Sequence, residues 1–319
     1  MKRATIRSTG AYLPDRIMTN YDLEKMVDTS HEKIVQLTGI KERRIAGEKE
    51  LTSDMAIAAA RQALDNAGLT PAAIDAIVLA TTTPDDTFPA TAVKVQAALG
   101  MEHGFAFDVQ AVCSGFIYAL SMANNLIATG MAKRVLVIGA EKMSSILDWT
   151  DRGTCILFGD GAGAVILEET EEPKAGFLTT HLHSDGRYRD MLYTNGGVGA
   201  TKTAGHIQMQ GKEVFKHAVE CLASVVEEAL AAAHLQPEDI DLLVPHQANV
   251  RIIESTAKKL GMSMDKVVVT LDKHGNTSAA SIPLALHTAV SAGRVKRGDL
   301  VLLEAMGGGF TWGAMLLRW

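Results

Sequence analysis

The stretch AGLTPAAIDAIVLATTT, residues 67–83, decides the fold, because the chain contains a second copy of it. The copy is AHLQPEDIDLLVPHQAN, residues 233–249, which aligns without a gap and places Pro71 opposite Pro237. Each copy has the pattern of a helix end, a proline-marked turn and a buried strand. Self-similarity at one fixed offset indicates that the same supersecondary unit is built twice.

A second pair of anchors lies further along each half. Cys113 stands as far before Gly130 as Asn276 stands before Gly293. Each glycine is followed by a Lys-Arg pair and an apolar strand. The offset between the halves is shorter at this pair of anchors than at Pro71 and Pro237, so the second half has lost three residues between the two pairs. If a pseudo-twofold axis relates the halves, Cys113 and Asn276 begin equivalent helices and face each other near that axis.

The rest of the chain alternates apolar strands with helices. Continuous Val/Ile/Leu runs within 133–141 and 156–169 predict strands that are covered on both faces, as in α/β proteins. We therefore predict a duplicated α/β fold with two halves, residues 1–172 and residues 173–319. Ligands of such sheets bind beyond the carboxyl ends of the strands, so the chemistry is expected at the seam between the halves.

Composition and charge exclude several classes of protein. The 319 residues carry 31 basic and 37 acidic side chains, and a net charge of −6 argues against nucleic-acid binding. Three cysteines, at positions 113, 155 and 221, predict neither a disulfide framework nor a zinc site and fit a cytoplasmic protein. The N-terminus alternates like a strand rather than a signal peptide, and no run of about 18 apolar residues predicts a membrane span.

Four motifs interrupt the apolar runs with reactive or small residues. In DVQAVCSGFIYALSMANNLIATG, residues 108–130, Cys113 stands at the first turn of a helix, where unpaired N–H groups and the helix dipole favour the thiolate. His246 follows a strand in VPHQAN, Asn276 heads a helix in HGNTSAAS, and EAMGGGFTWG places glycines 307–309 after the last strand.

Each motif alone has an ordinary structural interpretation. Cys113 could be a buried core thiol, His246 a strand-end histidine bonded to backbone, Asn276 an N-cap, and the glycines a loop. Together they supply a nucleophile, two hydrogen-bond donors and a backbone nest for an oxyanion. That combination favours a reaction site.

These motifs resemble those of β-ketoacyl-acyl carrier protein synthase III, the family of initiating condensing enzymes of bacterial fatty acid synthesis. The segments TGIKERRI at 38–45, DRGTCILFGDGAGAV at 151–165 and GKEVFKHAV at 211–219 extend the resemblance along the whole chain. It implies a thiolase-like fold, in which duplicated βαβαβ halves form a five-layered αβαβα architecture, and a homodimer. It also implies an acyltransferase that needs no cofactor and no metal.

The implied reaction joins an acyl group, typically acetyl in this family, from coenzyme A to malonyl-acyl carrier protein. Cys113 takes the acyl group, and loss of CO2 from the malonyl group creates the carbanion that attacks it. Neutral His246 and Asn276 then stabilise the negative charge on the malonyl thioester oxygen. The products are a 3-oxoacyl-acyl carrier protein, CO2 and coenzyme A.

The resemblance assigns further positions. The backbone N–H groups of Cys113 and Gly308 form the oxyanion hole, and Met306, together with Phe88 reaching across the dimer, shapes the acyl pocket. The expected contacts of coenzyme A and pantetheine are Thr38, Arg152, Gly211, Phe215 and Asn249. The expected basic patch for the acidic carrier protein is Lys216, Arg251, Lys258 and Lys259, the last three on one helical face.

One position departs from the family pattern. The family stacks the adenine of coenzyme A between a tryptophan and an arginine, and although Arg152 is present, Lys33 stands at the tryptophan position and Leu37 at that of a nearby arginine. A lysine cannot stack on a base. We therefore expect weaker coenzyme A binding or a different acyl donor.

Other functions are less consistent with the sequence. GDGAGA at 159–164 fits a dinucleotide fingerprint but leads into a strand rather than a helix, which disfavours a nicotinamide oxidoreductase. HLH at 181–183 with Asp185 has too few potential ligands for a metal site. A catalytically silent scaffold would have lost Cys113, His246 or Asn276, whereas a sister acyltransferase of secondary metabolism would have the same residues.

Overall fold

The computed structural model describes residues 2–172 and 174–319, and it contains two large mixed sheets. In the first sheet β4 runs parallel to both β5 and β6, and β7 and β1 extend it in antiparallel pairs. Its strand order is β1 (Arg3–Tyr12), β7 (Gly161–Thr170), β6 (Arg134–Glu141), β4 (Ala76–Ala80) and β5 (Phe105–Val109).

The second sheet repeats this plan with one strand fewer. Its strand β11 is parallel to β12, and β13 and β8 continue it in antiparallel pairs. Its order is β11 (Leu242–Pro245), β12 (Leu300–Gly307), β13 (Thr311–Arg318) and β8 (Gly176–Ser184). The counterpart of β5 is reduced to a parallel bridge between Leu243 and Val267.

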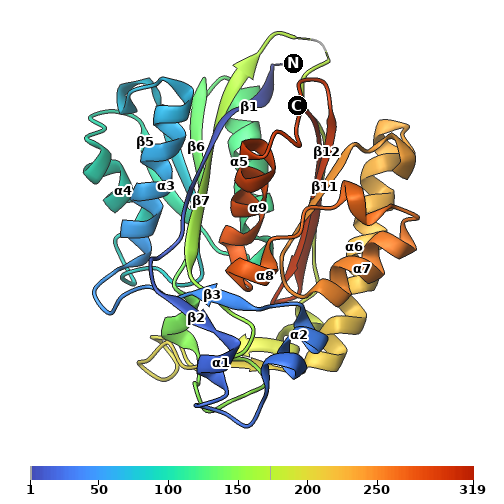
Figure 1. Cartoon of the computed structure of the whole chain (residues 1–319). Helices are drawn as coiled ribbons and strands as arrows, with labels where there is room; N and C mark the ends of the chain where they lie inside the picture. Colours follow the sequence, from blue (N-terminus) through green and yellow to red (C-terminus); the bar gives the residue numbers. More distant parts are fainter. Residues whose placement is uncertain (1, 173) are drawn as a thin grey trace.

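Helices cover both faces of both sheets, so that the molecule has five layers (Figure 1). The outer helices of the first sheet are α3 (Thr52–Ala67) and α4 (Thr91–Leu99), and those of the second are α6 (Gly211–Ala233) and α7 (Val250–Lys259). Between the sheets lie α5 (Gly115–Ala128) and α9 (Ser281–Ser291). This is the predicted five-layered αβαβα architecture.

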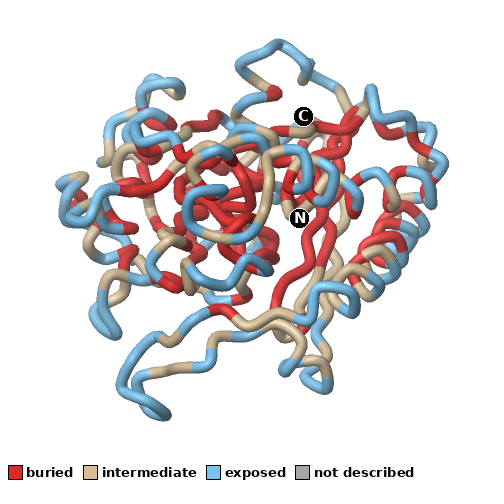
Figure 2. Tube along the Cα trace, turned by 60° about the horizontal axis from the view of Figure 1, so that its bottom comes forward, coloured by how far each residue is buried: buried red, intermediate tan, exposed pale blue. Residues whose placement is uncertain are grey.

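The hydrophobic core explains why the middle helices carry so few polar residues. One cluster joins α5 and α9 to strands of both sheets, with Phe116, Leu286 and Val301 all fully buried. Two further clusters fill the spaces between each sheet and its outer helices. A helix between two sheets must be apolar around its circumference, and Figure 2 shows the buried segments gathered in the centre of the molecule.

The structure confirms the duplication and corrects one detail of it. Two pairs of 3-10 turns occupy equivalent places in the two halves. The first pair is η1 (Pro71–Ala73) and η5 (Pro237–Asp239), and the second is η2 (Val112–Ser114) and η7 (Ser278–Ala280). The same number of residues separates the two members of each pair. The first residues of η2 and η7, Val112 and Ser278, share positive φ angles of 48° and 49°. The counterpart of Cys113 is therefore Ala279, not Asn276. The second half is three residues shorter than the first in α9, after η7, and not before η7 as the sequence alignment assumed.

A smaller group of elements covers the lower end of the molecule in Figure 1. Two short sheets contribute, one pairing β2 (Ile17–Thr19) with β3 (Glu42–Arg44) and the other β9 (Leu192–Thr194) with β10 (Ile207–Met209). The other short elements here are α1 (Asn20–Leu23), α2 (His31–Thr38), α8 (Leu271–His274), η3 (Met143–Ile146) and η4 (Gly186–Met191). The remaining turn, η6 (Met264–Lys266), lies beside the amino end of β11, where Lys266 donates to the carbonyl oxygens of Glu238 and Ile240.

The predicted division of the chain falls between β7 and β8, and residue 173, at that boundary, lies outside the described residues. The two halves share the central cluster around α5 and α9, so the division at 172 and 173 stays a prediction about duplication rather than about separate domains. Within the two described ranges, no helix has both the length and the apolar character that a membrane crossing requires.

Candidate active site

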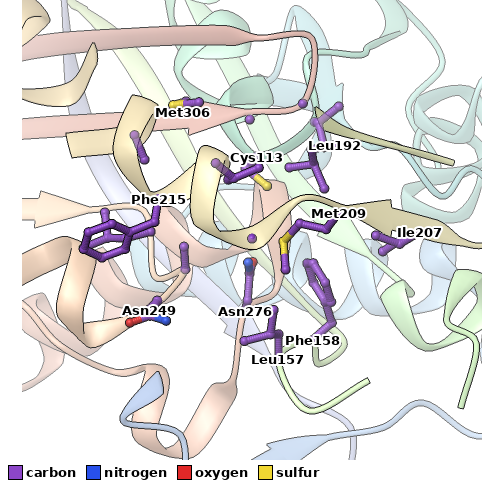
Figure 3. Close-up of a pocket in the computed structure, with 18 of the residues that line it drawn as sticks. Cys113, Leu157, Phe158, Leu192, Ile207, Met209, Phe215, Asn249, Asn276 and Met306 are labelled. Carbon is purple, nitrogen blue, oxygen red and sulfur yellow. The ribbon is translucent and has the colours of Figure 1, made fainter. Parts of the chain in front are cut away.

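A cavity of about 1000 Å³ opens at the carboxyl ends of the parallel strands, where the two halves meet. Cys113, His246 and Asn276 all line it. Figure 3 shows Cys113 and Asn276 between Phe215 and Asn249 on one side and Met209 and Phe158 on the other. The structure thus brings the three predicted residues together from η2, the end of β11 and the segment before η7.

Close backbone packing holds Cys113 in the turn before α5. A Cβ on Gly307 would lie 2.7 Å from the backbone nitrogen of Cys113, so β12 can approach Cys113 this closely only with glycine there. A Cβ on Gly115 would lie 3.2 Å from the Cβ of Ala80. The side chain of Cys113 is 5% exposed.

The charge state of Cys113 differs from the sequence-based expectation. Burial raises the pKa of the thiol to about 12, and the negative charge of Glu141 adds to this, although a hydrogen bond from Ser278 and the backbone N–H of Cys113 lower it. The prediction that the helix N-terminus favours the thiolate is therefore wrong for the resting site. Loss of water around the sulfur is the largest cause of the raised pKa.

His246 is neutral and has one defined tautomer. Burial lowers its pKa to about 3. Its Nδ1 lies 2.6 Å from Oγ of Ser281, and the same Oγ accepts the N–H of Gln247 at 3.3 Å. Nδ1 is the only acceptor that the Ser281 hydroxyl has among the described residues, so donation to Nδ1 satisfies the hydroxyl and places the ring proton on Nε2. With this tautomer His246 presents the N–H of Nε2 as a donor, and its predicted role in the reaction stays a prediction.

Asn276 is held by the first half of the chain. Its N–H donates to the carbonyl of Leu157 at 2.9 Å, and its own carbonyl accepts the N–H of Gly159 at 3.0 Å. Its side-chain Oδ1 accepts the N–H of Ser278 at 2.9 Å. With Oδ1 used in this way, the Nδ2 group is the part of Asn276 that can serve a ligand, again as a donor.

The glycines at the end of β12 and just after it also line the cavity beside Cys113. Gly307, Gly308 and Gly309 are all in its wall, and a Cβ on Gly308 would lie 2.7 Å from the carbonyl oxygen of Leu192. Gly308 therefore lies next to the cavity with its backbone closely packed. Its role with Cys113 in an oxyanion hole stays a prediction.

The predicted coenzyme A residues line the outer part of the cavity: Thr38, Arg152, Gly211, Phe215 and Asn249. The side chain of Asn249 accepts the N–H of Arg251 and donates to the carbonyl of Leu37, so it caps α7 and ties it to α2. Arg152 forms an ion pair of 2.9 Å with Asp28.

The positions that depart from the family pattern, Lys33 and Leu37, line the same region. Sequence reasoning missed two further cations in the wall, Arg189 and Lys212. Arg189 lies in a segment without a recognisable motif, and Lys212 lies in the GKEVFKHAV segment without having been singled out. Only the packing of η4 and α6 around the opening brings both to the cavity.

Met306 lines the cavity, whereas Phe88 does not line the cavity of its own chain. Phe88 is 84% exposed. Its predicted role in a partner's pocket is untested. The apolar wall near Cys113 also contains residues that the sequence did not single out: Met143, Phe158, Leu192, Ile207 and Met209. They come from separate elements and look like ordinary core residues in the sequence.

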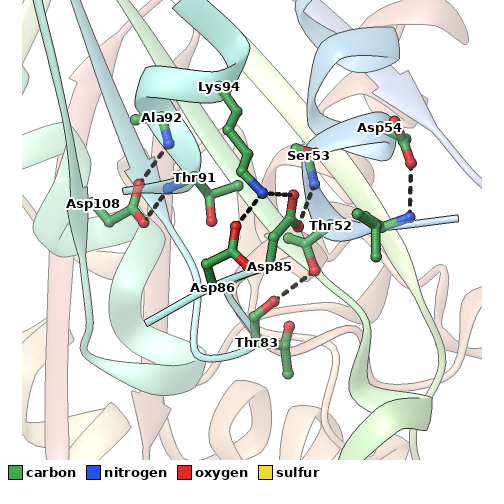
Figure 4. Close-up of polar contacts among 11 residues, drawn as sticks. Thr52, Ser53, Asp54, Thr83, Asp85, Asp86, Thr91, Ala92, Lys94 and Asp108 are labelled. Carbon is green, nitrogen blue, oxygen red and sulfur yellow. Dashed lines mark hydrogen bonds and ion pairs between the residues drawn. The ribbon is translucent and has the colours of Figure 1, made fainter. Parts of the chain in front are cut away.

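The loop that carries Phe88 is fixed at both ends (Figure 4). Asp85 accepts the N–H of Ser53 at 3.0 Å, and Lys94 on α4 forms ion pairs with both Asp85 and Asp86. Asp108 accepts the N–H groups of Thr91 and Ala92 at the start of α4. The exposed phenyl ring therefore projects from an ordered loop.

The predicted basic patch divides into two parts. Arg251 lines the cavity mouth, with its guanidinium 5.7 Å from the ring centre of Phe215. Lys216, Lys258 and Lys259 are exposed and lie outside the cavity wall. Whether they bind a carrier protein stays a prediction.

The two sequence features set aside earlier have structural roles. Gly161 of GDGAGA begins β7, a strand rather than a helix. His181 and His183 both contact Glu228, at 3.0 and 2.6 Å. Across the part of the chain that the structure describes, no group of three or more His, Cys, Asp or Glu side chains is arranged to hold a metal ion.

Comparisons with known proteins agree with this geometry. The family model of 3-oxoacyl-[acyl-carrier-protein] synthase III matches residues 107–186, and the model of its C-terminal region matches residues 230–319. The β-ketoacyl-[acyl-carrier-protein] synthase III of Agrobacterium fabrum is 62% identical over 323 residues, which cover 100% of both chains. That of Rhodospirillum centenum is 64% identical over 320 residues, with 99% of each chain covered.

Solved structures show the same fold. The crystal structure of 3-oxoacyl-[acyl-carrier-protein] synthase III from Aquifex aeolicus has a TM-score of 0.95 and 52% identity, covering 99% of this chain and 100% of that one. The priming β-ketosynthase of the R1128 polyketide biosynthetic pathway has a TM-score of 0.94 and 34% identity, with 99% and 97% covered. The chain therefore belongs to the β-ketoacyl-[acyl-carrier-protein] synthase III family of acyltransferase-type condensing enzymes.

Proposed function

We propose that this protein condenses an acyl group, taken from acyl-coenzyme A, with malonyl-acyl carrier protein, and so initiates type II fatty acid synthesis. The observation that carries the proposal is the convergence of Cys113, a neutral His246 and Asn276 on one cavity. A thiol and two uncharged donors suit a reaction that forms an acyl-enzyme and then an enolate.

In the first step Sγ of Cys113 forms a bond to the acyl carbon, and the bond from that carbon to the sulfur of coenzyme A breaks. The proton of the thiol ends on the departing coenzyme A. The N–H groups of Cys113 and Gly308 serve the oxyanion of this step. Their proposed role is supported by the position of both residues in the cavity wall.

In the second step the malonyl thioester loses CO2, and its former C–C bonding pair becomes the nucleophile. Because decarboxylation supplies the carbanion, no side chain has to remove a carbon-bound proton. Nε2 of His246 and Nδ2 of Asn276 donate to the thioester oxygen that gains negative charge. The carbanion then attacks the acyl group on Cys113, and the thiolate leaves.

The substrates suit the composition of the cavity wall. Among the described residues, the wall of the cavity contains no Asp or Glu. Five basic side chains line it: Lys33, Arg152, Arg189, Lys212 and Arg251. Phosphate groups of coenzyme A or of a carrier-bound phosphopantetheine complement such a wall. We further propose that the enzyme is a homodimer in which Phe88 reaches the partner's acyl pocket, supported by its 84% exposure on an ordered loop.

Intact mass spectrometry tests the proposal directly. Incubation with a panel of acyl-coenzymes A should add one acyl mass to the protein and none to the Cys113→Ala variant, whereas Cys221→Ala should acylate like the wild type. Addition of malonyl-acyl carrier protein should then remove the mass with release of CO2. Absence of an adduct from every donor would overturn the mechanism.

The priming ketosynthase relative supports one alternative, an acyltransferase that starts a secondary-metabolite chain. The residues around Cys113 would be the same for both reactions. The preferred donor in the mass-spectrometric panel, and the carrier protein that accepts the acyl group, distinguish them.

A further inference from the structure

Arg43, in the middle of β3, is the largest of the side chains that the described part of the protein buries completely. Its guanidinium donates to three oxygen atoms, none of which belongs to a carboxylate. Nη1 lies 2.9 Å from Oδ1 of Asn20 and 3.3 Å from the carbonyl oxygen of Met18, and Nη2 lies 2.7 Å from the carbonyl oxygen of Ile156. Burying a cation without an opposite charge costs free energy, and an apolar side chain of similar volume often packs as well. Packing alone therefore does not explain an arginine at this position.

The segment that begins at Ile156 in turn holds Asn276. The N–H of Asn276 donates to the carbonyl oxygen of Leu157 at 2.9 Å, and the N–H of Gly159 donates to the carbonyl oxygen of Asn276 at 3.0 Å. These two bonds form a parallel bridge of the kind found between strands. Asn276 therefore takes its place in the cavity wall from this segment, and the bond from Arg43 fixes the carbonyl group next to the bridge.

The stem of Arg43 also lies against the backbone on both sides of this bridge. A Cβ on Gly159 would lie 2.9 Å from the Cβ of Arg43, and a Cβ on Gly275 would lie 3.0 Å from it. Both positions therefore need glycine for this close approach. The acceptor Asn20 is itself fixed, because its amide donates to the carbonyl oxygen of Ile40 at 2.7 Å. The planar guanidinium thus joins two fixed segments of the chain.

We propose that Arg43 is a positioning residue that sets the orientation of Asn276 in the cavity. Arg43 fixes segment 156–159, this segment fixes the backbone of Asn276, and the N–H of Ser278 holds Oδ1 so that Nδ2 remains for the substrate. The inference rests on the proposed function, because there Nδ2 serves the oxygen that gains charge during decarboxylation. Acylation of Cys113 needs no contact from Nδ2. Loss of Arg43 should therefore slow the second step of the reaction and spare the first.

Replacing Arg43 by methionine tests this order of effects. Arg43→Met keeps most of the side-chain volume and removes the three hydrogen bonds. The rate at which the acylated enzyme releases CO2 from malonyl-acyl carrier protein should fall about 10- to 100-fold, because a small misplacement of a reacting group has effects of this size. Acylation of Cys113 at saturating acyl-coenzyme A, followed by intact mass spectrometry, should keep the wild-type rate. Equal losses in both steps would contradict the inference.

Arg44→Met is the matched control. Arg44 is the next residue of β3, so its side chain points to the other face of the strand, and it donates to the carbonyl oxygen of Pro14 at 3.2 Å. Both steps should proceed at the wild-type rates. Arg43→Lys is the conservative variant, which keeps the charge but not the planar fork, so its CO2 release should lie between that of Arg43→Met and that of the wild type. Arg43→Lys also replaces Arg43→Met in every comparison if the methionine variant does not fold.

A double-mutant cycle separates the positioning of Asn276 from a general loss of structure. Asn276→Ala removes the donor itself. If Arg43 acts through Asn276, adding Arg43→Met to Asn276→Ala should lower CO2 release no further. The same factor of loss in both backgrounds would show that Arg43 acts elsewhere, and it would refute the inference.

Amide hydrogen exchange measures the hold on Asn276 without any reaction. Mass spectrometry of peptides that span 156–160 and 275–278 should show faster exchange in Arg43→Met than in the wild type, because the bridge opens more often. Arg44→Met should exchange like the wild type, and unchanged exchange in Arg43→Met would contradict the inference. A wild-type enzyme that releases no CO2 would contradict the proposed function alone, and the exchange rates would still decide whether Arg43 holds Asn276.

Discussion

At the scale of single residues, the site is defined by which atoms have partners and which are left for substrate. Oδ1 of Asn276 and Nδ1 of His246 are occupied by Ser278 and Ser281, so each side chain presents a donor. Burial keeps His246 neutral, which prevents it from acting as a charged acid but suits it to stabilise an enolate. The supporting hydroxyl of Ser281 should therefore affect the rate.

Ser281→Ala should lower kcat for malonyl decarboxylation about 5- to 30-fold, corresponding to about 1–2 kcal/mol, because His246 loses control of its tautomer. KM for malonyl-acyl carrier protein should change less than twofold, since the substrate still binds. Release of labelled CO2 measures both. Ser121→Ala, a buried serine of α5 outside the cavity wall, is the control, and an unchanged kcat for Ser281→Ala would contradict the assignment.

Glu304 predicts a pH effect on stability. It is fully buried, neither carboxyl oxygen has a hydrogen-bond partner among the described residues, and burial raises its pKa to about 8. The unfolded chain releases this proton near pH 4.5, so the folded state holds more protons between pH 4.5 and 8. The free energy of unfolding should therefore fall as the pH rises through this window.

Glu304→Gln removes this titration and should reduce that fall by a few kcal/mol. Urea unfolding at pH 5, 7 and 8.5 measures the difference. Glu141 adds a fall of the same sign in both proteins, because its pKa is raised to about 7. The exposed Glu238→Gln is the control, and parallel pH curves for Glu304→Gln and wild type would refute the effect.

At the scale of elements, α2 and α7 form one side of the cavity opening and are tied together by Asn249. Side chains three or four residues apart share a helix face, so Lys33 and Leu37 both reach the cavity from α2. The helix ends at Gly39, whose φ of 81° is the left-handed cap typical of glycine. The proposed coenzyme A site therefore has a fixed wall on this side.

Lys33→Trp should restore a stacking surface and lower KM for acyl-coenzyme A about 5- to 100-fold, since stacking a base on an aromatic ring contributes about 1–3 kcal/mol. The measurement is steady-state kinetics with acyl-coenzyme A as the varied substrate. Gln36→Trp adds the same ring on an exposed part of α2 outside the cavity wall and should have no effect. An unchanged KM in Lys33→Trp would reject the role of this position.

Arg251→Glu should raise KM for malonyl-acyl carrier protein about tenfold at low salt and weaken its salt dependence, because a charge at the rim then repels an acidic partner. Lys259→Glu, further along α7 and outside the cavity wall, should have a smaller effect. Lys296→Glu, before the amino end of β12, is the control. An effect of Lys296→Glu as large as that of Arg251→Glu would argue against a localised docking surface.

At the scale of the whole molecule, the two halves act as one body. The helices α5 and α9 share a single core with both sheets, and the site lies where the halves meet. A single chain nevertheless leaves Phe88 at 84% exposure, which is uncommon for a phenyl ring on an ordered loop. The proposed second copy of the chain would offer the ring an apolar surface.

Phe88→Ala should weaken the proposed dimer and enlarge the acyl pocket, so that longer acyl-coenzymes A gain in kcat/KM relative to acetyl-coenzyme A. Sedimentation equilibrium and a chain-length series measure the two effects. Val198→Ala, another highly exposed apolar side chain, should leave both unchanged. A wild-type protein that stays monomeric at micromolar concentrations would contradict the arrangement.

The sequence by itself determined the duplication and the layered α/β fold, and it singled out Cys113, His246 and Asn276 as the candidate reactive residues that the structure places in one cavity. These features are readable because strand and helix periodicities are local and because the reactive residues interrupt apolar runs. The family resemblance added the outer residues of the cavity, and the structure places all of its coenzyme A positions in the wall.

Only the tertiary structure decided the electrostatics and the inner wall. The sequence placed Cys113 at a helix start and so suggested a lowered pKa, but burial between the two halves raises it to about 12. Likewise, Met143, Leu192 and Met209 come from separate elements and carry no shared motif, so only folding brings them into the cavity wall with Cys113. Desolvation and contacts between distant segments depend on packing in three dimensions, which no local pattern encodes.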